Sequence, residues 1–310
     1  MEMVFQMSRL FFLALIFMSS TSLGASEYSG RVIAFAQDTM ANDFRKAQVL
    51  QVRDEISKHS DLSFVYADGM GQTSLLIHHI DEFIRQKVDL LIVGTNDERA
   101  VVPVISKAYH SGIPVIILDR GIQSTVYTTF INSDNYEIGQ IGASYIAEEL
   151  GYQGVVLLFE GIQEADVTQL RSKGFIDVMS QYQDIEIIRR TGNYLRKDAI
   201  VEMEKLVEEG IQIDAIFSES DSMLSGVRMV LNRKNIDPKS IFMVGVDYTS
   251  EAQDAIRTGH QMGSILFPLG GVKAVETALE ILGGKQVEKH LRIPVKLVTK
   301  ENVDVLKPIF

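Results

Sequence analysis

The sequence of 310 residues contains no cysteine. Without thiols, the protein can form neither disulfides nor thiolate metal sites, and it offers no cysteine nucleophile and no cysteine for lipid attachment. Its stability must therefore come from packing, for which 310 residues and a hydrophobic content of 46% are sufficient. With 23% charged residues, this composition is that of a globular protein and excludes fibrous and disordered classes.

Basic residues are fewer than acidic ones, with 30 Lys and Arg against 41 Asp and Glu, so the formal net charge is −11. No basic stripe is available to follow a phosphate backbone, and nucleic acid is not an expected partner. The six histidines fall on predicted helices or loops away from the strand ends discussed below. They indicate neither a histidine base nor a metal site.

Long apolar runs are also absent beyond the N-terminus. Residues 10–18 are almost wholly apolar and residues 19–25 are mostly small or polar, which is typical of a secretory signal peptide. The run is shorter than the roughly 20 residues that span a bilayer. We expect residues 1–25 to be a signal peptide and the mature protein to be soluble, with a retained N-terminal anchor as the alternative.

From residue 31 onward, short apolar runs alternate with amphipathic stretches. The runs predict strands at residues 32–36, 62–66, 90–94, 115–118, 128–132, 155–159, 186–189, 215–218, 242–246, 263–267 and 293–298. Strands that alternate with helices predict parallel sheets with right-handed crossovers. Because the rhythm restarts after residues 134–135, we expect two similar lobes.

The most informative strand follows Pro114 and ends in Asp119 and Arg120. Its continuous apolar run fits a strand that is buried on both faces of a parallel sheet. Ligands bind at the carboxyl ends of strands in open α/β sheets, so these two charges are candidate hydrogen-bonding groups. A turn with a local salt bridge between them is the alternative.

Other strand ends carry similar side chains. After the first strand there is no Gly-x-Gly-x-x-Gly, which argues against a nicotinamide or flavin cofactor. Instead, Phe44 lies between Asn42 and Arg45, a combination that suits a sugar ring and its hydroxyls. Phe44 as a core residue is the alternative. The strand ends of the second half present Arg171, Tyr194, Asp221 and Asp247.

These later residues also have ordinary structural explanations. Arg171 could be a solvated helix residue and Tyr194 a loop aromatic with a bonded hydroxyl. Asp221 and Asp247 could each cap the following helix. Asp119 and Asp247 could in principle form a glycosidase pair, but no Gly-x-Ser-x-Gly elbow or phosphate loop is present. We expect no catalytic activity.

Together, five segments carry a resemblance to a known family, namely 113–120, 133–135 with Gly139, 171–175, 220–223 with Gly226, and 244–247. Over residues 31–303 the chain resembles the periplasmic sugar-binding proteins of the ribose and galactofuranose type, the type I substrate-binding proteins of ABC transporters. The resemblance implies an α/β fold of two similar doubly wound parallel-sheet lobes joined by a three-stranded hinge. The implied lobes are 26–132 plus 268–295 and 133–267 plus 296–310, with crossings near 132–134, 267–268 and 294–296.

The resemblance also implies a site in which Phe44 stacks on the sugar and Arg45 bonds its hydroxyls, opposed by groups of the second lobe. The implied ligand-binding residues are Gln37, Asn42, Phe44, Arg45, Asp119, Arg120, Arg171, Tyr194, Ser220, Asp221, Asp247 and Phe267. Family members usually have asparagine at Ser220, commonly a polar residue near Phe267, and a further glycine near Glu164. A hydroxyl cannot reproduce the donor and acceptor of an amide, so we expect a larger or less usual sugar than ribose.

The implied function is that of a monomeric periplasmic protein that needs no cofactor, closes around a small carbohydrate and delivers it to an ABC transporter permease. A sensor that docks on a chemoreceptor or sensor kinase is an alternative with the same fold. The effector domain of a LacI-type transcription regulator also shares the fold, but it would need a basic helix-turn-helix before the first strand. This chain has an apolar leader there.

Overall fold

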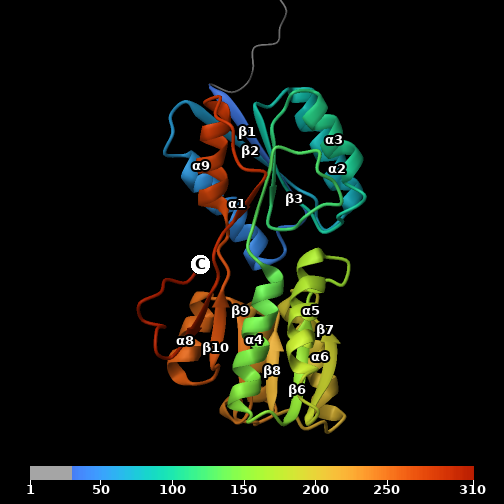
Figure 1. The fold of residues 1–310 in the computed structure, drawn as a ribbon, viewed down its shortest axis with the longest axis vertical. Coiled ribbons are helices and arrows are strands. Elements are labelled where there is room, and N and C mark those ends of the chain that lie inside the picture. Colours follow the sequence, from blue (N-terminus) through green and yellow to red (C-terminus); the bar gives the residue numbers. More distant parts are fainter. Residues whose placement is uncertain (1–29) are drawn as a thin grey trace, which may run out of the picture.

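The computed structural model describes residues 30–310, so the predicted signal peptide lies outside the described residues. Two lobes follow one another along the long axis of the molecule (Figure 1). Each lobe is built on a six-stranded sheet. The predicted fold class, two α/β lobes with mainly parallel sheets, is confirmed. Within residues 30–310, no helix is both long and apolar enough to cross a bilayer.

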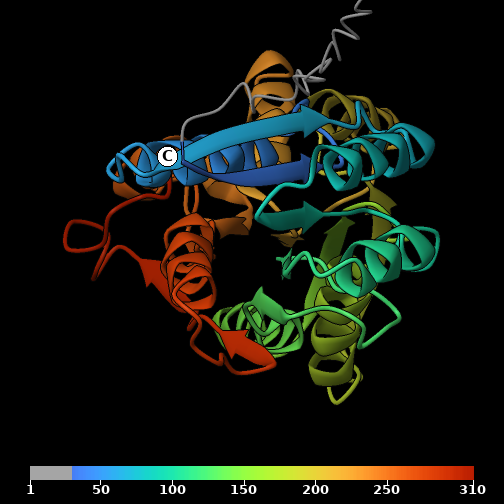
Figure 2. The same cartoon turned by 90° about the horizontal axis from the view of Figure 1, so that it is seen from above.

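The first lobe has the strand order β11-β5-β4-β3-β1-β2, with every pair parallel. Its strands are β1 (Arg31–Gln37), β2 (Leu62–Asp68), β3 (Leu90–Gly94), β4 (Val115–Leu118), β5 (Thr129–Asn132) and β11 (His290–Arg292). Helices α2 (Thr73–Gln86) and α3 (Val102–His110) cover one face, and α1 (Asp43–Ile56) and α9 (Gly271–Leu282) cover the other (Figure 2). Each face therefore has its own apolar core.

The second lobe repeats this plan in the order β12-β10-β9-β8-β6-β7, in which only β12 is antiparallel to its neighbour among the described strands. Its strands are β6 (Gly154–Glu160), β7 (Ile185–Thr191), β8 (Ala215–Ser218), β9 (Phe242–Asp247), β10 (Gly263–Leu266) and β12 (Lys296–Thr299). Its helices are α4 (Asn135–Glu149), α5 (Asp166–Met179), α6 (Arg196–Glu208), α7 (Asp221–Arg233) and α8 (Ser250–Thr258), with a short 3₁₀ turn at Pro238–Ser240. Helices α4 and α5 pack on one face, α6 and α7 on the other.

Local sequence explains how strands and helices meet at the cleft between the lobes. Strand β4 is buried at every position because helices cover both faces of its sheet. Helix α1 begins a short loop after β1, where the side chain of Asn42 accepts from the backbone N–H of Arg45 at 3.0 Å and caps the helix. Ser220 caps α7 in the same way through the N–H of Met223. Helix N-termini thus lie beside the strand ends that carry the predicted site.

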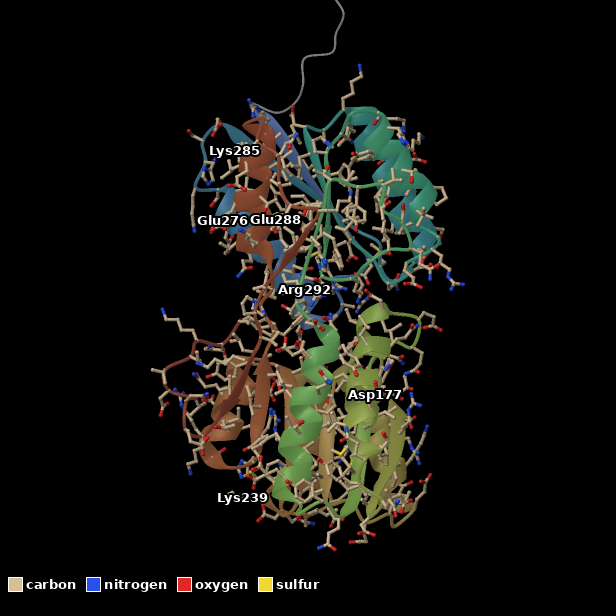
Figure 3. The ribbon with its side chains drawn as sticks, in the orientation of Figure 1. Asp177, Lys239, Glu276, Lys285, Glu288 and Arg292 are labelled. Carbon is tan, nitrogen blue, oxygen red and sulfur yellow. The ribbon has the colours of Figure 1, made fainter. Side chains whose placement is uncertain are left out.

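The chain passes between the lobes after β5, after β10 and after β11 (Figure 1). The strand predicted at residues 293–298 is confirmed only for residues 296–298, which belong to β12 of the second sheet, whereas residues 293–295 form no strand. The strand before them, β11, belongs to the first sheet. Pro294, which has no N–H to donate, lies in the gap between the two strands. Arg292 lies at the waist of the molecule and forms an ion pair with Asp134 across two of these connections (Figure 3).

Candidate functional site

A cavity lies where the carboxyl ends of the two sheets face one another. Its walls contain all the residues that we predicted for ligand binding except Gln37 and Asp221. The lining residues are Asn42, Phe44, Arg45, Asp119, Arg120, Val167, Arg171, Tyr194, Ser220, Asp247 and Phe267. Val167 is the residue of this set that sequence reasoning missed, since an apolar side chain on a helix gives no signal of its own.

On the first lobe, the charged wall is an alternation of acids and arginines. Arg45 Nη1 lies 2.8 Å from Asp119 Oδ2, and its Nε lies 3.5 Å from Asp38 Oδ1. Arg120 Nη1 donates to the other oxygen of Asp38 at 3.0 Å. Asp119 and Arg120 therefore do not form the local salt bridge that was the alternative. Each instead pairs with a residue from the end of β1 or the start of α1.

This wall keeps polar atoms without partners. Arg45 Nη2, Asp119 Oδ1 and Arg120 Nε are buried and have no hydrogen-bond partner among the described residues. Unpaired buried polar atoms are costly, so their presence in a cavity wall points to a polar ligand. The pKa of Arg45 is raised by Asp119 and Asp38 although burial opposes this, whereas burial and the neighbouring Arg45 lower the pKa of Arg120. Arginine and carboxylate together supply the donors and acceptors that a hydroxyl pair requires.

On the second lobe, Arg171 is held rigidly. Its Nε donates to Asn135 Oδ1 at 2.9 Å and its Nη1 donates to the carbonyl oxygen of Glu219 at 2.7 Å. The predicted alternative of a solvated Arg171 is excluded, because only 3% of the residue is exposed. Helix α4 comes close to α5 here because Gly139 has no side chain: a Cβ would lie 2.0 Å from the carbonyl oxygen of Arg171.

Two further polar groups complete this wall. Burial raises the pKa of Asp247 well above its usual value, and nearby Arg171 opposes the rise. The charged form of such a buried carboxyl is stabilised when a ligand hydroxyl donates a hydrogen bond to it. Ser220 lines the cavity while its oxygen caps α7. Asp247 does not cap the next helix, since the side chain of Thr249 does so through the N–H of Ala252.

Aromatic rings form the rest of the cavity. Phe44 stacks on Phe267 with ring centroids 5.2 Å apart. The Arg171 guanidinium lies 4.6 Å from the centroid of Phe267. The ring of Tyr194 lies beneath the Arg120 guanidinium at 5.5 Å, and its hydroxyl is 2.7 Å from Thr168 Oγ1. Burial raises the pKa of Tyr194, so its hydroxyl stays protonated.

Three residues of the cavity wall have left-handed backbone conformations. The φ angles are 72° for Asp119, 60° for Tyr194 and 108° for Asp247. Such angles are uncommon for residues with a side chain, and they cluster at functional sites. The coincidence of all three with the cavity supports a functional role for it.

Gln37 and Asp221 were predicted for the site but point into the protein. Gln37 Nε2 donates to Gln48 Oε1 at 3.0 Å, and its Oε1 occupies the space where Gly94 lacks a Cβ. Asp221 accepts hydrogen bonds from Tyr248 N at 2.8 Å and Ser264 Oγ at 2.7 Å. Both residues therefore support the strand ends behind the cavity. Neither residue lines the cavity, where their contact with a ligand was predicted.

Among residues 30–310, three hydrogen bonds join the two lobes beside the cavity, and we call them the lobe-bridging bonds. The N–H of Gly121 donates to Asp166 Oδ2 at 2.8 Å. Asn42 Nδ2 donates to the carbonyl oxygen of Tyr194 at 2.8 Å. Ser222 Oγ donates to Asp43 Oδ2 at 3.2 Å. The cavity is thus enclosed by direct contacts between the lobes.

The chain that forms this cavity is similar to known proteins. Residues 33–286 match the model of the periplasmic binding protein domain family. The chain belongs to this family. The resemblance predicted from sequence is thereby confirmed.

Curated relatives of this periplasmic binding protein domain include the ribose import binding protein of Bacillus subtilis, which is 27% identical over 87% of each chain. The D-apiose import binding protein of Paraburkholderia graminis is 27% identical over 92% of each chain. Among solved structures, the fructose-binding periplasmic domain of a hybrid two-component system has a TM-score of 0.83 at 26% identity and covers 89% of this chain and 92% of its own. A solute-binding protein of Bacillus halodurans, solved with myo-inositol, has a TM-score of 0.84 at 23% identity, with coverage of 91% and 98%, and supports the fold alone.

Proposed function

We propose that the protein is a periplasmic solute-binding protein that captures a small carbohydrate between its two lobes and delivers it to an ABC transporter permease. The observation that carries the proposal is the set of unpaired polar atoms on Arg45, Asp119 and Arg120 beside the ring of Phe44. Paired hydroxyls would satisfy those donors and acceptors, while the C–H face of a sugar ring packs on the aromatic ring. The relatives named for ribose and apiose import support the same class of ligand.

The proposed mechanism is closure of the two lobes on the ligand. Asp119 and Arg120 would hold one edge of the sugar from the first lobe, and Arg171 and Asp247 would meet it from the second. A ligand that contacts both lobes binds the closed form more tightly than the open one, and this difference is what shifts a hinge equilibrium. The closed form would then be the state that the membrane partner recognises.

The proposal includes properties that the sequence predicted. The mature protein would act in the periplasm after removal of residues 1–25, as a monomer, and without covalent chemistry or a cofactor. Recovery of a bound sugar unchanged after long incubation with the protein tests the last point, and conversion of the sugar would contradict it. Edman sequencing of the exported protein tests the cleavage site.

A sensor function is the second candidate. It is favoured by the likeness to the fructose-binding domain of a hybrid two-component system. In this case the closed lobes would dock on a chemoreceptor or sensor kinase rather than on a permease. Crosslinking in membranes with and without ligand separates the two, because capture of a permease alone would exclude the sensor function.

The identity of the ligand is the most direct test. The purified protein is denatured, and any released small molecule is identified by mass spectrometry. The refolded, ligand-free protein is then titrated by calorimetry with pentoses, hexoses and polyols. We expect heat for at least one carbohydrate, abolished in Asp119→Ala and retained in Asp177→Ala, whose aspartate lies on α5 and pairs with Lys173 outside the cavity. Silence across the whole panel would refute carbohydrate binding.

A further inference from the structure

The hinge side of the cavity is closed by Phe267, which follows β10 directly. One face of its ring is stacked on Phe44 at 5.2 Å, and the Arg171 guanidinium lies over the ring at 4.6 Å from its centroid. The two partners come from different lobes, so the ring is held between them. Phe267 lines the cavity with an apolar ring, although only 3% of the residue is exposed.

The backbone beside this ring adds no hydrogen-bond donor. The N–H of Phe267 already donates to the carbonyl oxygen of Asp247 at 3.3 Å. Pro268 has no N–H. The side chain of Gln48 reaches this connection, but its Nε2 already donates to the carbonyl oxygen of Leu269 at 2.7 Å. A hydroxyl that pointed at Phe267 would therefore lose its water without gaining a donor from this segment.

The unpaired polar atoms of the cavity lie elsewhere, on Arg45, Asp119 and Arg120 of the first lobe. Asp247, whose burial disfavours its charge, is the acidic group of the second lobe. Together with Arg171, whose guanidinium also lines the cavity, these groups would recognise the ring hydroxyls. The part of a sugar that remains for Phe267 is the substituent on the last ring carbon, which can be varied without changing the ring hydroxyls.

We infer that this substituent is apolar, so that the protein selects a sugar with a methyl group or a hydrogen in place of the hydroxymethyl group of the matching hexose. The inference rests on the proposed function and names its ligand class as deoxy or shortened sugars. Burial of a hydroxyl without a partner is expected to weaken binding about tenfold or more. A methyl group instead gains from contact with the apolar ring.

The test uses matched series that differ only at this carbon. D-Galactose, D-fucose and L-arabinose share one ring configuration and carry a hydroxymethyl group, a methyl group and a hydrogen, respectively. D-Glucose, D-quinovose and D-xylose form a second series, and D-mannose, D-rhamnose and D-lyxose a third. Calorimetry gives the dissociation constant of every member for the ligand-free wild-type protein and for Phe267→Gln and Phe267→Leu.

In the series that binds, we expect the methyl or hydrogen member to bind at least about tenfold more tightly than the hexose. Phe267→Gln, which adds a donor and an acceptor, should reduce or invert this ratio, and Phe267→Leu should preserve it. A hexose that binds as tightly as its deoxy partner would overturn the inference while leaving the proposed function intact, as would an unchanged ratio in Phe267→Gln. If no member of the three series binds while another carbohydrate of the broader panel does, the inference is overturned and the proposed function stands; silence across the broader panel would overturn both. The wild-type ratio decides the question even if a variant fails to fold.

Discussion

Two buried glutamates face each other behind the cavity, and their arrangement yields a quantitative prediction. Ser172 Oγ lies 2.8 Å from Glu219 Oε1 and 2.7 Å from Glu160 Oε1. A hydroxyl has one hydrogen, so it can donate to only one of the two carboxyls. Arg189 binds both oxygens of Glu160, at 2.6 and 3.1 Å, and stabilises its charge. We therefore expect Glu219 to be the group that carries a proton, which it would donate to Ser172.

The pKa of Glu219 agrees with this assignment. Burial raises it from the ordinary 4.5 to about 7, even though Arg171 and the N–H of Gly161 act in the opposite direction. The folded protein thus binds this proton more tightly than the unfolded chain does. Between about pH 4.5 and pH 7, the free energy of unfolding must fall as the pH rises, because the folded state gives up the proton with difficulty. At roughly 1.4 kcal/mol for each pKa unit, the loss reaches about 3 kcal/mol.

Glu219→Gln should remove this pH dependence. The amide of glutamine can donate to Ser172 and accept from the N–H of Gly161, as the protonated acid does. Below pH 5 the variant and the wild type should therefore have similar stability. At pH 8 the variant should be more stable by up to about 3 kcal/mol. Other buried acids, such as Asp221, titrate in both proteins and cancel in the difference.

Urea unfolding of the ligand-free protein at pH 5, 6, 7 and 8 measures this difference. Far-UV circular dichroism is the appropriate signal, because the sequence contains no tryptophan. Glu164→Gln, which alters an exposed glutamate in the loop after β6, is the matched control and should follow the wild type. If the curves of wild type and Glu219→Gln run parallel from pH 5 to pH 8, the proton is not on Glu219 and the reasoning is wrong.

Three further changes address the cavity and the cleft. Asp119→Asn removes the charge that pairs with Arg45 and should weaken ligand binding by about 10- to 100-fold in calorimetry; an unchanged affinity would mean that Asp119 makes no ligand contact. Phe44→Leu keeps apolar volume but loses aromatic stacking, so affinity should fall by about 0.5–1.5 kcal/mol; no loss would place the sugar away from this ring. Ser222→Ala breaks the bond to Asp43 outside the cavity, and titration with two ligands should show an equal loss of a few-fold for both. A changed preference between those two ligands would contradict a role in closure alone.

The part of the fold that sequence could predict is the part set by local patterns. Continuous apolar runs such as residues 115–118 located the buried strands, because a strand covered on both faces needs apolar residues at every position. The strand predicted at residues 293–298 began too early, because an apolar pattern does not show where the chain leaves one sheet for another. The chain passes from β11 of the first sheet to β12 of the second through residues 293–295, which include Pro294 and form no strand.

The site was predictable to the extent that strand ends meet at one edge of a sheet. This rule placed Asp119, Arg120 and Asp247 correctly in one cavity. It could not show the direction of each side chain, so Gln37 and Asp221 were included although both hydrogen-bond into the protein. The direction of a side chain is decided by partners distant in sequence, which a local pattern does not contain.

The lobe-bridging bonds have a consequence for the resting state of the system. Neither Asp166 nor Ser222 lines the cavity, so the bonds of these residues to Gly121 and Asp43 need no ligand atom in order to form. Each such bond favours closure of the empty molecule by about 1 kcal/mol. A membrane partner that recognised lobe closure alone would also bind closed protein that contains no sugar. It would then be activated to some extent without sugar. Weak lobe-bridging bonds keep this ligand-independent signal low. Stronger bonds would raise the affinity for the sugar but would reduce the difference in signal between the sugar-bound and the empty protein.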